Sequence, residues 1–370
     1  MDQDYKIKIG QYLELAQSQG ASDLHLGVGR RPTLRIDGNL VQLTKEPIFV
    51  KEDMDGVIKV LLNEDQRKQF EEEKEIDFGY SHEEKIRCRC NVYLQRSMIT
   101  VAIRLIPFQI RSIEELNLPH VIHEFAKISQ GFCLVVGPAG NGKSTTLAAL
   151  IDEVNHKRFD HIITIEDPIE YVFDQDRCLI DQREIGFDTM SFNRALRSAL
   201  RQDPDVLMVG EMRDPETMSI ALTAAETGHL VFSTLHTNNA AQTIDRIIDS
   251  FPSAQQGQIR SQLASTIVGV VSQRLIPRIE GGRVPATEVM LANAAIRNLI
   301  REDKVYQIDL VIETSLDKGM VSLNRSLVDL VRRREISEES AYLYSVNPSE
   351  LKNFLDSTMS FTQNLQGNTM

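Results

Sequence analysis

The stretch from Gly137 to Ser144, Gly-Pro-Ala-Gly-Asn-Gly-Lys-Ser, constrains the fold more than any other part of the chain. It is a complete G-x-x-x-x-G-K-[ST] motif, and it directly follows the apolar run 132–136, which predicts a buried strand. The glycines allow backbone N–H groups to point into the loop, and the helix predicted from Thr145 directs its positive end to the same place. The sequence therefore predicts a phosphate-binding loop between a strand and a helix.

The residue types of this loop suit a nucleoside triphosphate and its magnesium ion. Lys143 supplies a mobile cation for the β- and γ-phosphates, and the hydroxyl of Ser144 is a ligand for Mg²⁺. We therefore expect ATP and Mg²⁺ as cofactors. The residues expected to bind the nucleotide are Gly137, Pro138, Ala139, Gly140, Asn141, Gly142, Lys143, Ser144 and Thr145.

Composition narrows the class of protein further. A chain of 370 residues that is 42% hydrophobic is long enough for two domains, or for three. The 41 basic and 53 acidic residues give a net charge of −12, which disfavours a grip on nucleic acid that rests on overall charge. No signal segment and no apolar run of membrane-spanning length is found, so a cytoplasmic protein is expected. The four cysteines form no C-x-x-C pair, which predicts buried free thiols.

The N-terminal third predicts a small α/β or PAS-like domain. A helical pattern over 7–19 is followed by short alternating runs at 23–26, 33–36 and 40–43, and the last two are joined around Asp37-Gly38 as in a hairpin. Further strands are expected at 86–92 and 99–104.

Arginines lie on the polar faces of these two later strands. The alternation turns Arg89 and Arg104 away from the apolar side, and Arg96 falls in the turn between them. Exposed arginines on a sheet usually serve solubility. The phosphate-binding loop downstream favours a second role, because phosphoryl transfer requires a guanidinium at the γ-phosphate and the loop itself supplies only a lysine.

From Gly131 onward, strands alternate with helices, which implies a mostly parallel sheet whose ligands collect at the carboxyl ends of the strands. Strand 162–165 runs into Glu166, strand 206–209 into Glu211, and strand 231–235 into His236. Acids at such positions suit Mg²⁺ binding and activation of the attacking water. Taken singly, each acid could equally be a helix cap or a surface charge.

Several separate motifs carry a resemblance to the type IV pilus retraction ATPases of the secretion ATPase superfamily. The resemblance extends from Ala21 to about Tyr344, and the C-terminal motif is its most discriminating part. The matching segments are an N-terminal signature (21–25), an Asp box (165–170), an atypical Walker B motif with glutamate in place of aspartate (207–214), a His box (227–229 and 234–237) and the C-terminal motif (295–302). Relatives commonly carry Pro-Thr-Gly-Ser where this chain has 138–141, and we expect those positions to contribute backbone.

The resemblance also implies roles for the acids at the strand ends. Glu211 would support Mg²⁺ together with Ser144. Glu170 would activate water, and Glu166 is its rival because it lies directly at the strand end.

The histidines and arginines receive roles in the same way. His229 and His236 would sense the γ-phosphate or link subunits. The arginines that the N-terminal domain would bring over the nucleotide are Arg89, Arg96 and Arg104.

Together, the motifs predict an α/β protein with a RecA-like P-loop ATPase core, an N-terminal PAS-like domain and a small C-terminal helical subdomain. The expected boundaries are 1–112 for the N-terminal domain and linker, 113–292 for the core, 293–356 for the helical subdomain and 357–370 for a disordered tail.

The expected function, implied by the resemblance, is that of a homo-hexameric motor at the cytoplasmic face of the inner membrane. It would hydrolyse ATP and drive pilus retraction through an inner-membrane platform protein, acting on pilin indirectly and without nucleic acid. Three alternatives stay open: a pilus extension or type II secretion ATPase, which usually carries an extra N-terminal domain and a tetracysteine zinc insertion; a non-hydrolysing accessory subunit; and a RecA-like nucleic-acid motor.

Overall fold

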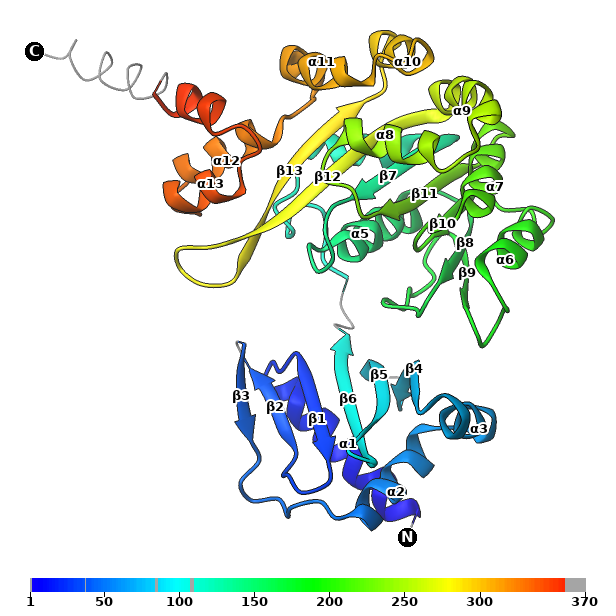
Figure 1. Cartoon of the computed structure of the whole chain (residues 1–370), viewed down its shortest axis with the longest axis vertical. Coiled ribbons are helices and arrows are strands. Elements are labelled where there is room, and N and C mark those ends of the chain that lie inside the picture. The colour runs from blue at the N-terminus through cyan, green and yellow to red at the C-terminus, as the bar shows by residue number, and fades with distance from the viewer. Residues whose placement is uncertain (1, 37, 84–85, 107–109, 357–370) are drawn as a thin grey trace, which may run out of the picture. The chain divides into compact units, whose positions relative to one another are not determined.

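The computed structural model describes residues 2–36, 38–83, 86–106 and 110–356. Contacts divide the chain into an N-terminal unit, Met1–Ile110 with Pro168–Val172, and a C-terminal unit, Arg111–Asp167 with Phe173–Met370. Figure 1 shows both units. The predicted tail 357–370 and Asp37 of the predicted hairpin turn lie outside the described residues.

The N-terminal unit is built on a six-stranded antiparallel sheet in the order β3-β2-β1-β6-β5-β4. Its strands are β1 (Asp23–Gly27), β2 (Thr33–Ile36), β3 (Asn39–Gln42), β4 (Glu75–His82), β5 (Ile86–Gln95) and β6 (Met98–Ile106). Its helices are α1 (Asp2–Ser18), α2 (Lys51–Leu61) and α3 (Glu64–Glu73). The predicted hairpin is present, because Ile36 pairs with Asn39.

Alternation along β5 explains how this sheet buries one face. Cys88, Cys90 and Val92 are buried, whereas Arg87 and Arg89, which alternate with them, are only partly covered. Helix α1 packs against α2, β1, β5 and β6, and it buries Leu13 and Ala16 in the same core. All four cysteines are buried free thiols, as predicted.

The C-terminal unit contains a seven-stranded sheet in the order β13-β12-β7-β11-β10-β8-β9. All neighbouring strands are parallel except β12 and β13. The strands are β7 (Gly131–Val136), β8 (His161–Glu166), β9 (Leu179–Glu184), β10 (Val206–Val209), β11 (Leu230–Leu235), β12 (Ile267–Pro277) and β13 (Arg283–Leu291). The predicted α/β class is confirmed.

Helices cover both faces of this sheet. Helix α5 packs on one face, and the helices from α6 to α9 pack on the other, where their apolar side chains share one core with inward-facing residues of the strands. The helices are α4 (His123–Lys127), α5 (Lys143–Lys157), α6 (Phe192–Ala199), α7 (Pro215–Glu226), α8 (Ala240–Asp249) and α9 (Ser253–Thr266).

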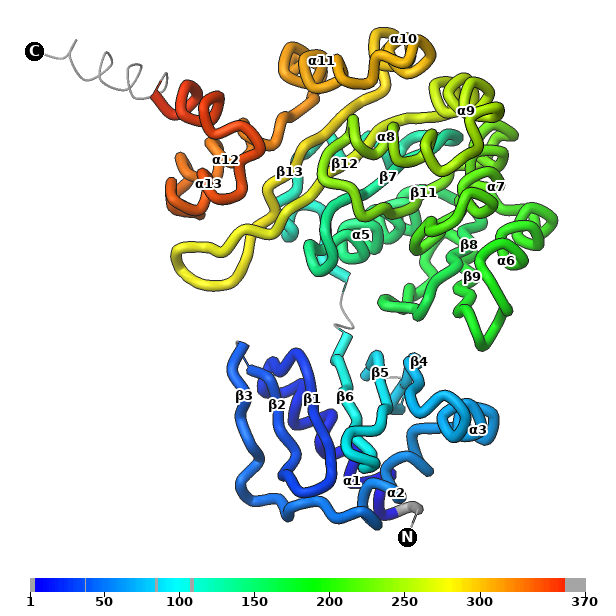
Figure 2. The backbone as a smooth tube through the Cα atoms, viewed as in Figure 1, coloured from blue at the N-terminus to red at the C-terminus, as the bar shows by residue number. Residues whose placement is uncertain are grey.

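The end of the described chain is helical and packs on the β12–β13 hairpin. Ile276, Val284 and Ala286, in the half of the hairpin nearest its turn, are buried with Leu323 and Leu327 of α12. The helices are α10 (Ala294–Arg301), α11 (Ile308–Thr314), α12 (Leu323–Arg332) and α13 (Glu338–Tyr344), and the short 3₁₀ segments of the unit are His120–Ile122, Val305–Gln307 and Leu316–Lys318. Figure 2 follows the chain from β13 through α10 and α11 to α12 and α13.

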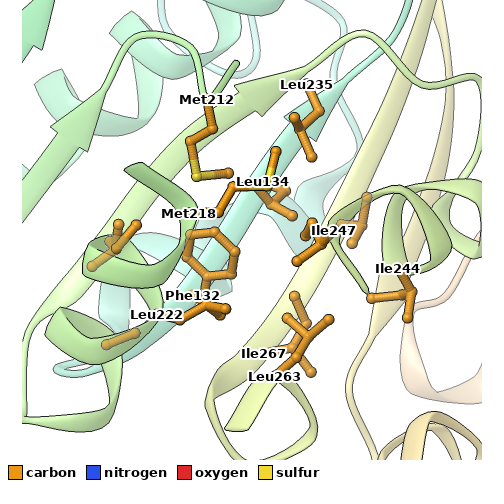
Figure 3. Close-up of a cluster of buried hydrophobic side chains, with 14 of the residues drawn as sticks. Phe132, Leu134, Met212, Met218, Leu222, Leu235, Ile244, Ile247, Leu263 and Ile267 are labelled. Atoms are coloured by element: carbon orange, nitrogen blue, oxygen red, sulfur yellow. The ribbon is translucent and has the colours of Figure 1, made fainter. Parts of the chain in front are cut away.

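The buried core also fixes one end of the candidate site. Met212, directly after Glu211, is buried in the same cluster as Leu134, Met218 and Leu235, as Figure 3 shows. Because a tightly packed methionine is restrained by its neighbours, the adjoining backbone that carries Glu211 is held in place by the core.

Within the described residues, none of the helices is both long and apolar enough to cross a bilayer.

Candidate active site

The loop Gly137–Gly142 connects β7 to α5, and its glycines are required by close contacts. Gly137 has φ +144 and Gly142 has φ +80, both in the region that favours glycine. A Cβ atom at Gly137 would lie 2.3 Å from the carbonyl oxygen of Gln273, and one at Gly142 would lie 2.9 Å from the Gln273 side chain. The loop therefore lies directly on β12, and helix α5 begins at Lys143.

Lys143 extends over the inside of the loop. Its ammonium group donates to the carbonyl oxygens of Gly137 (2.9 Å) and Pro138 (3.1 Å), and it lies 3.4 Å from Nδ1 of His236. The residue is 8% exposed. A flexible ammonium group at this position can exchange carbonyl contacts for phosphate oxygens without a change in the backbone.

His236 connects this lysine to an acid from the neighbouring strand. Its Nε2 lies 3.3 Å from Oε1 of Glu211, whose other oxygen accepts a hydrogen bond from Arg213 at 2.9 Å. Burial alone would raise the pKa of Glu211, but the hydrogen bond from Arg213 and the charges of Arg213, His236 and Lys143 together lower it. Glu211 is thus held as a carboxylate beside the phosphate-binding loop.

Glu166 is the acid at the end of β8, and it is almost fully buried. It is 6% exposed, and its Oε1 accepts hydrogen bonds from the Thr164 hydroxyl (2.7 Å) and the Gln182 amide (3.4 Å). Since β8, β10 and β11 lie side by side and parallel, Glu166, Glu211 and His236 share the carboxyl edge of the sheet.

The donors for Mg²⁺ fit the ion in type. Ser144, in the first turn of α5, offers a hydroxyl, and Glu211 offers a carboxylate whose pKa is lowered. Hydroxyl, carboxylate and phosphate oxygens are the ligands that Mg²⁺ takes in nucleotide sites.

His229 does not join this group, and the prediction that it senses the γ-phosphate of its own chain needs correction. It precedes β11, whereas His236 follows β11, so the strand of six residues separates them by about 20 Å. The ring of His229 is bonded to the carbonyl oxygen of Ala224 at 2.9 Å, which closes the end of α7. A role between subunits stays a prediction.

The three predicted arginines lie in the N-terminal unit. Arg89 and Arg104 are direct cross-strand partners on β5 and β6. Arg89 is bonded to Asp77 at 2.5 Å and Arg104 to Asp23 at 3.0 Å. Arg96 occupies the turn between the strands with φ +51. Their predicted role at the nucleotide stays a prediction.

Glu170 lies in the stretch 168–172 that clusters with the N-terminal unit, and its side chain is half-buried. Its predicted role as the base that activates water also stays a prediction.

Asn141 is the residue that sequence reasoning misjudged. Its side-chain oxygen accepts from the N–H of Leu275 at 2.8 Å, and its amide nitrogen reaches the carbonyl oxygen of Ala139 at 3.2 Å. The Asn141 carbonyl accepts from the Gln273 side chain at 2.8 Å, and Gln273 accepts from the Thr146 hydroxyl at 2.7 Å. The expectation that this position contributes backbone is incomplete, because its side chain also ties the loop to β12.

Gln273 was missed altogether, since nothing in a strand sequence marks one polar residue as a partner of a loop more than 100 positions earlier. Arg213 was missed as well. Its position two residues after Glu211 was the available signal.

Comparison with known proteins decides the family. The profile of the family described as "Type II/IV secretion system protein" matches residues 2–294, most of the chain. The chain belongs to the type II/IV secretion system protein family. The resemblance predicted from its motifs is therefore confirmed.

Two relatives and one solved structure each match most of this chain. The type IV pilus retraction ATPase PilT of Pseudomonas aeruginosa is 47% identical over 335 residues, which cover 90% of this chain and 97% of that protein. A twitching motility protein of Neisseria gonorrhoeae is 44% identical, with 84% and 83% of the two chains covered. A crystal structure of the pilus retraction motor PilT with bound ADP superposes with a TM-score of 0.87 at 46% identity, covering 93% of this chain and 99% of that chain.

Proposed function

We propose that this chain is a motor ATPase that hydrolyses ATP to power the retraction of type IV pili. The observation that carries the proposal is the contact series from Lys143 through His236 to Glu211, which joins the phosphate-binding loop to two neighbouring strand ends. The match to the relative named as a pilus retraction ATPase covers 97% of that protein and 90% of this chain.

The residues of the site have separate tasks in this proposal. The loop N–H groups and Lys143 bind the phosphates, and Ser144 and Glu211 hold Mg²⁺, which neutralises charge on the phosphate oxygens when bound. His236 lies between Lys143 and Glu211, where it can register whether the lysine contacts phosphate. Glu170 is the proposed base for the attacking water, with Glu166 as the alternative.

The motor would work as a homo-hexamer at the cytoplasmic face of the inner membrane. There it would act on an inner-membrane platform protein and, through it, on pilin. The arginines Arg89, Arg96 and Arg104 would complete the site when the N-terminal unit moves, so that hydrolysis is coupled to motion.

The biochemical test is the Lys143→Ala variant. Because this variant lacks the cation of the loop, we expect no measurable ATP turnover. Circular dichroism and light scattering should show that its fold and its assembly are unchanged. Full turnover in this variant would refute the site.

The cellular test separates retraction from the alternatives. A deletion strain should keep its surface pili but lose twitching, and the wild-type gene but not the Lys143→Ala gene should restore motility. A strain that loses its pili would indicate an extension motor instead, and a strain that twitches normally would exclude the retraction role.

A further inference from the structure

Three potential metal ligands meet on the N-terminal unit. Glu14 comes from α1, His82 is the last residue of β4, and Glu83 follows it in the turn. One ring nitrogen of His82 and one carboxylate oxygen of each glutamate all lie within 4.8 Å of one another. The two glutamates are exposed, and the histidine is buried.

The histidine is what distinguishes this group from a chance cluster of surface acids. His82 is only 7% exposed, and its ring makes no hydrogen bond within the parts of the chain that the structure describes. Buried polar side-chain atoms nearly always have a partner. A buried histidine that has no hydrogen-bond partner among the described residues, and whose ring nitrogen lies within 4.8 Å of two carboxylate oxygens, points to a cation as that partner.

The sequence of α1 makes room for this ring. Gly10 lies one helical turn before Glu14, on the same face of the helix. A Cβ atom at Gly10 would lie 2.5 Å from both Cε1 and Nε2 of His82. Glycine weakens a helix interior, so its presence here is explained by the close approach of the imidazole, which brings the ring next to Glu14.

The donor set indicates the kind of ion. Two carboxylates balance the charge of a divalent cation, and an imidazole nitrogen favours a transition metal over Mg²⁺ or Ca²⁺, which take oxygen ligands. Zinc binds both histidine and glutamate readily in four-coordinate sites, in which water supplies the remaining position.

We propose that Glu14, His82 and Glu83 form a divalent transition-metal site, with Zn²⁺ as the best match, that links α1 to the end of β4. An ion that binds the folded chain and not the unfolded one stabilises the fold by mass action. The site would therefore fasten the N-terminal helix to its sheet.

The test is titration of the metal-stripped full chain with ZnCl₂, followed by calorimetry, without nucleotide and with excess Mg²⁺ to saturate oxygen-only sites. One saturable Zn²⁺ equivalent is expected. Glu14→Gln and His82→Gln should each weaken binding by about tenfold or more. Because Glu14 is exposed, its variant keeps the fold, which circular dichroism would verify.

Matched controls are Glu72→Gln on the exposed face of α3 and His156→Gln near the end of α5, neither of which belongs to the group. Both should bind Zn²⁺ as the wild type does. Co²⁺ gives an independent readout, since its visible absorption should weaken in the Glu14→Gln variant and not in the controls. Absence of a saturable Zn²⁺ site in the wild type, or unchanged affinity in Glu14→Gln, overturns the proposal.

Discussion

The side-chain oxygen of Asn141 accepts a hydrogen bond from the backbone N–H of Leu275 at 2.8 Å, so a residue of the phosphate-binding loop is joined to strand β12. Gln273, two residues earlier on β12, donates to the Asn141 carbonyl and accepts from the Thr146 hydroxyl. The loop is thereby held on both sides, by its own backbone and by a strand from much later in the chain.

Replacing Asn141 by alanine should weaken ATP binding more than it slows the chemical step. The loss of one such hydrogen bond, with a buried partner left unpaired, is worth about 1 kcal/mol, or about fivefold in affinity. Nucleotide titration and steady-state hydrolysis of Asn141→Ala would measure the two effects. Gln273→Ala and the double variant complete a cycle, and strictly additive effects would show that the two side chains do not act together.

The acids at the strand ends should respond differently to removal of their charge. Glu211→Gln should require more Mg²⁺ for half-maximal activity, because its carboxylate is the proposed metal support. Glu170→Gln should still bind ATP but hydrolyse it about 10²-fold more slowly, as expected for loss of a general base. If Glu166→Gln shows the slow hydrolysis and Glu170→Gln does not, the base is Glu166.

Arg89 and Arg104 should contribute to rate and not to nucleotide affinity. ATP is already held by the loop and Lys143, so Arg89→Ala or Arg104→Ala should lower kcat by up to about 10³-fold with little change in affinity. Arg35→Ala is a matched control, because Arg35 lies 3.9 Å from the same Asp23 that bonds Arg104. Equal rates in all three variants would mark these arginines as ordinary surface charge.

Stability should fall as the pH rises towards neutrality because of Glu288. Burial raises the pKa of this carboxyl to about 7 from an ordinary 4.5, although the N–H of Ala240 donates to it at 2.7 Å. Between those two pH values the folded chain binds more protons than the unfolded chain, so the free energy of unfolding decreases with increasing pH, by on the order of 3 kcal/mol.

Glu288→Gln should remove that dependence and be more stable than the wild type above pH 7. Urea unfolding at pH 5 and pH 8 would measure it, with Glu72→Gln as the control. A variant that keeps the wild-type slope would place the titrating group elsewhere.

The sequence predicted the parts of this fold whose signal is local. The motif Gly137–Ser144 indicated loop, strand and helix together, and apolar runs located β7, β8, β10 and β11 because buried parallel strands are continuously hydrophobic. Strand β9 was missed, since its polar sequence from Leu179 to Glu184 belongs to an edge strand and shows no such run.

The sequence predicted only those residues of the candidate site that directly follow a strand. Glu211 and His236 were expected near the loop because parallel strands end at one edge, and the structure brings both to it. His229 was grouped with them because a motif spans both histidines, although one precedes and the other follows the same strand. Asn141 could not be recognised, because its partner Leu275 is set by tertiary structure.

The hairpin of β12 and β13 serves two neighbours at once. In β12, Gln273 and Leu275 form hydrogen bonds with the phosphate-binding loop. The adjoining Ile276 is buried against α12 together with Val284 and Ala286 of β13. Cutting the chain before α12 would uncover this apolar surface and loosen the strand on which the loop rests. The terminal helices are thus not a detachable appendage, and a shortened chain that keeps every residue of the nucleotide motif would still lack the support that gives the motif its shape.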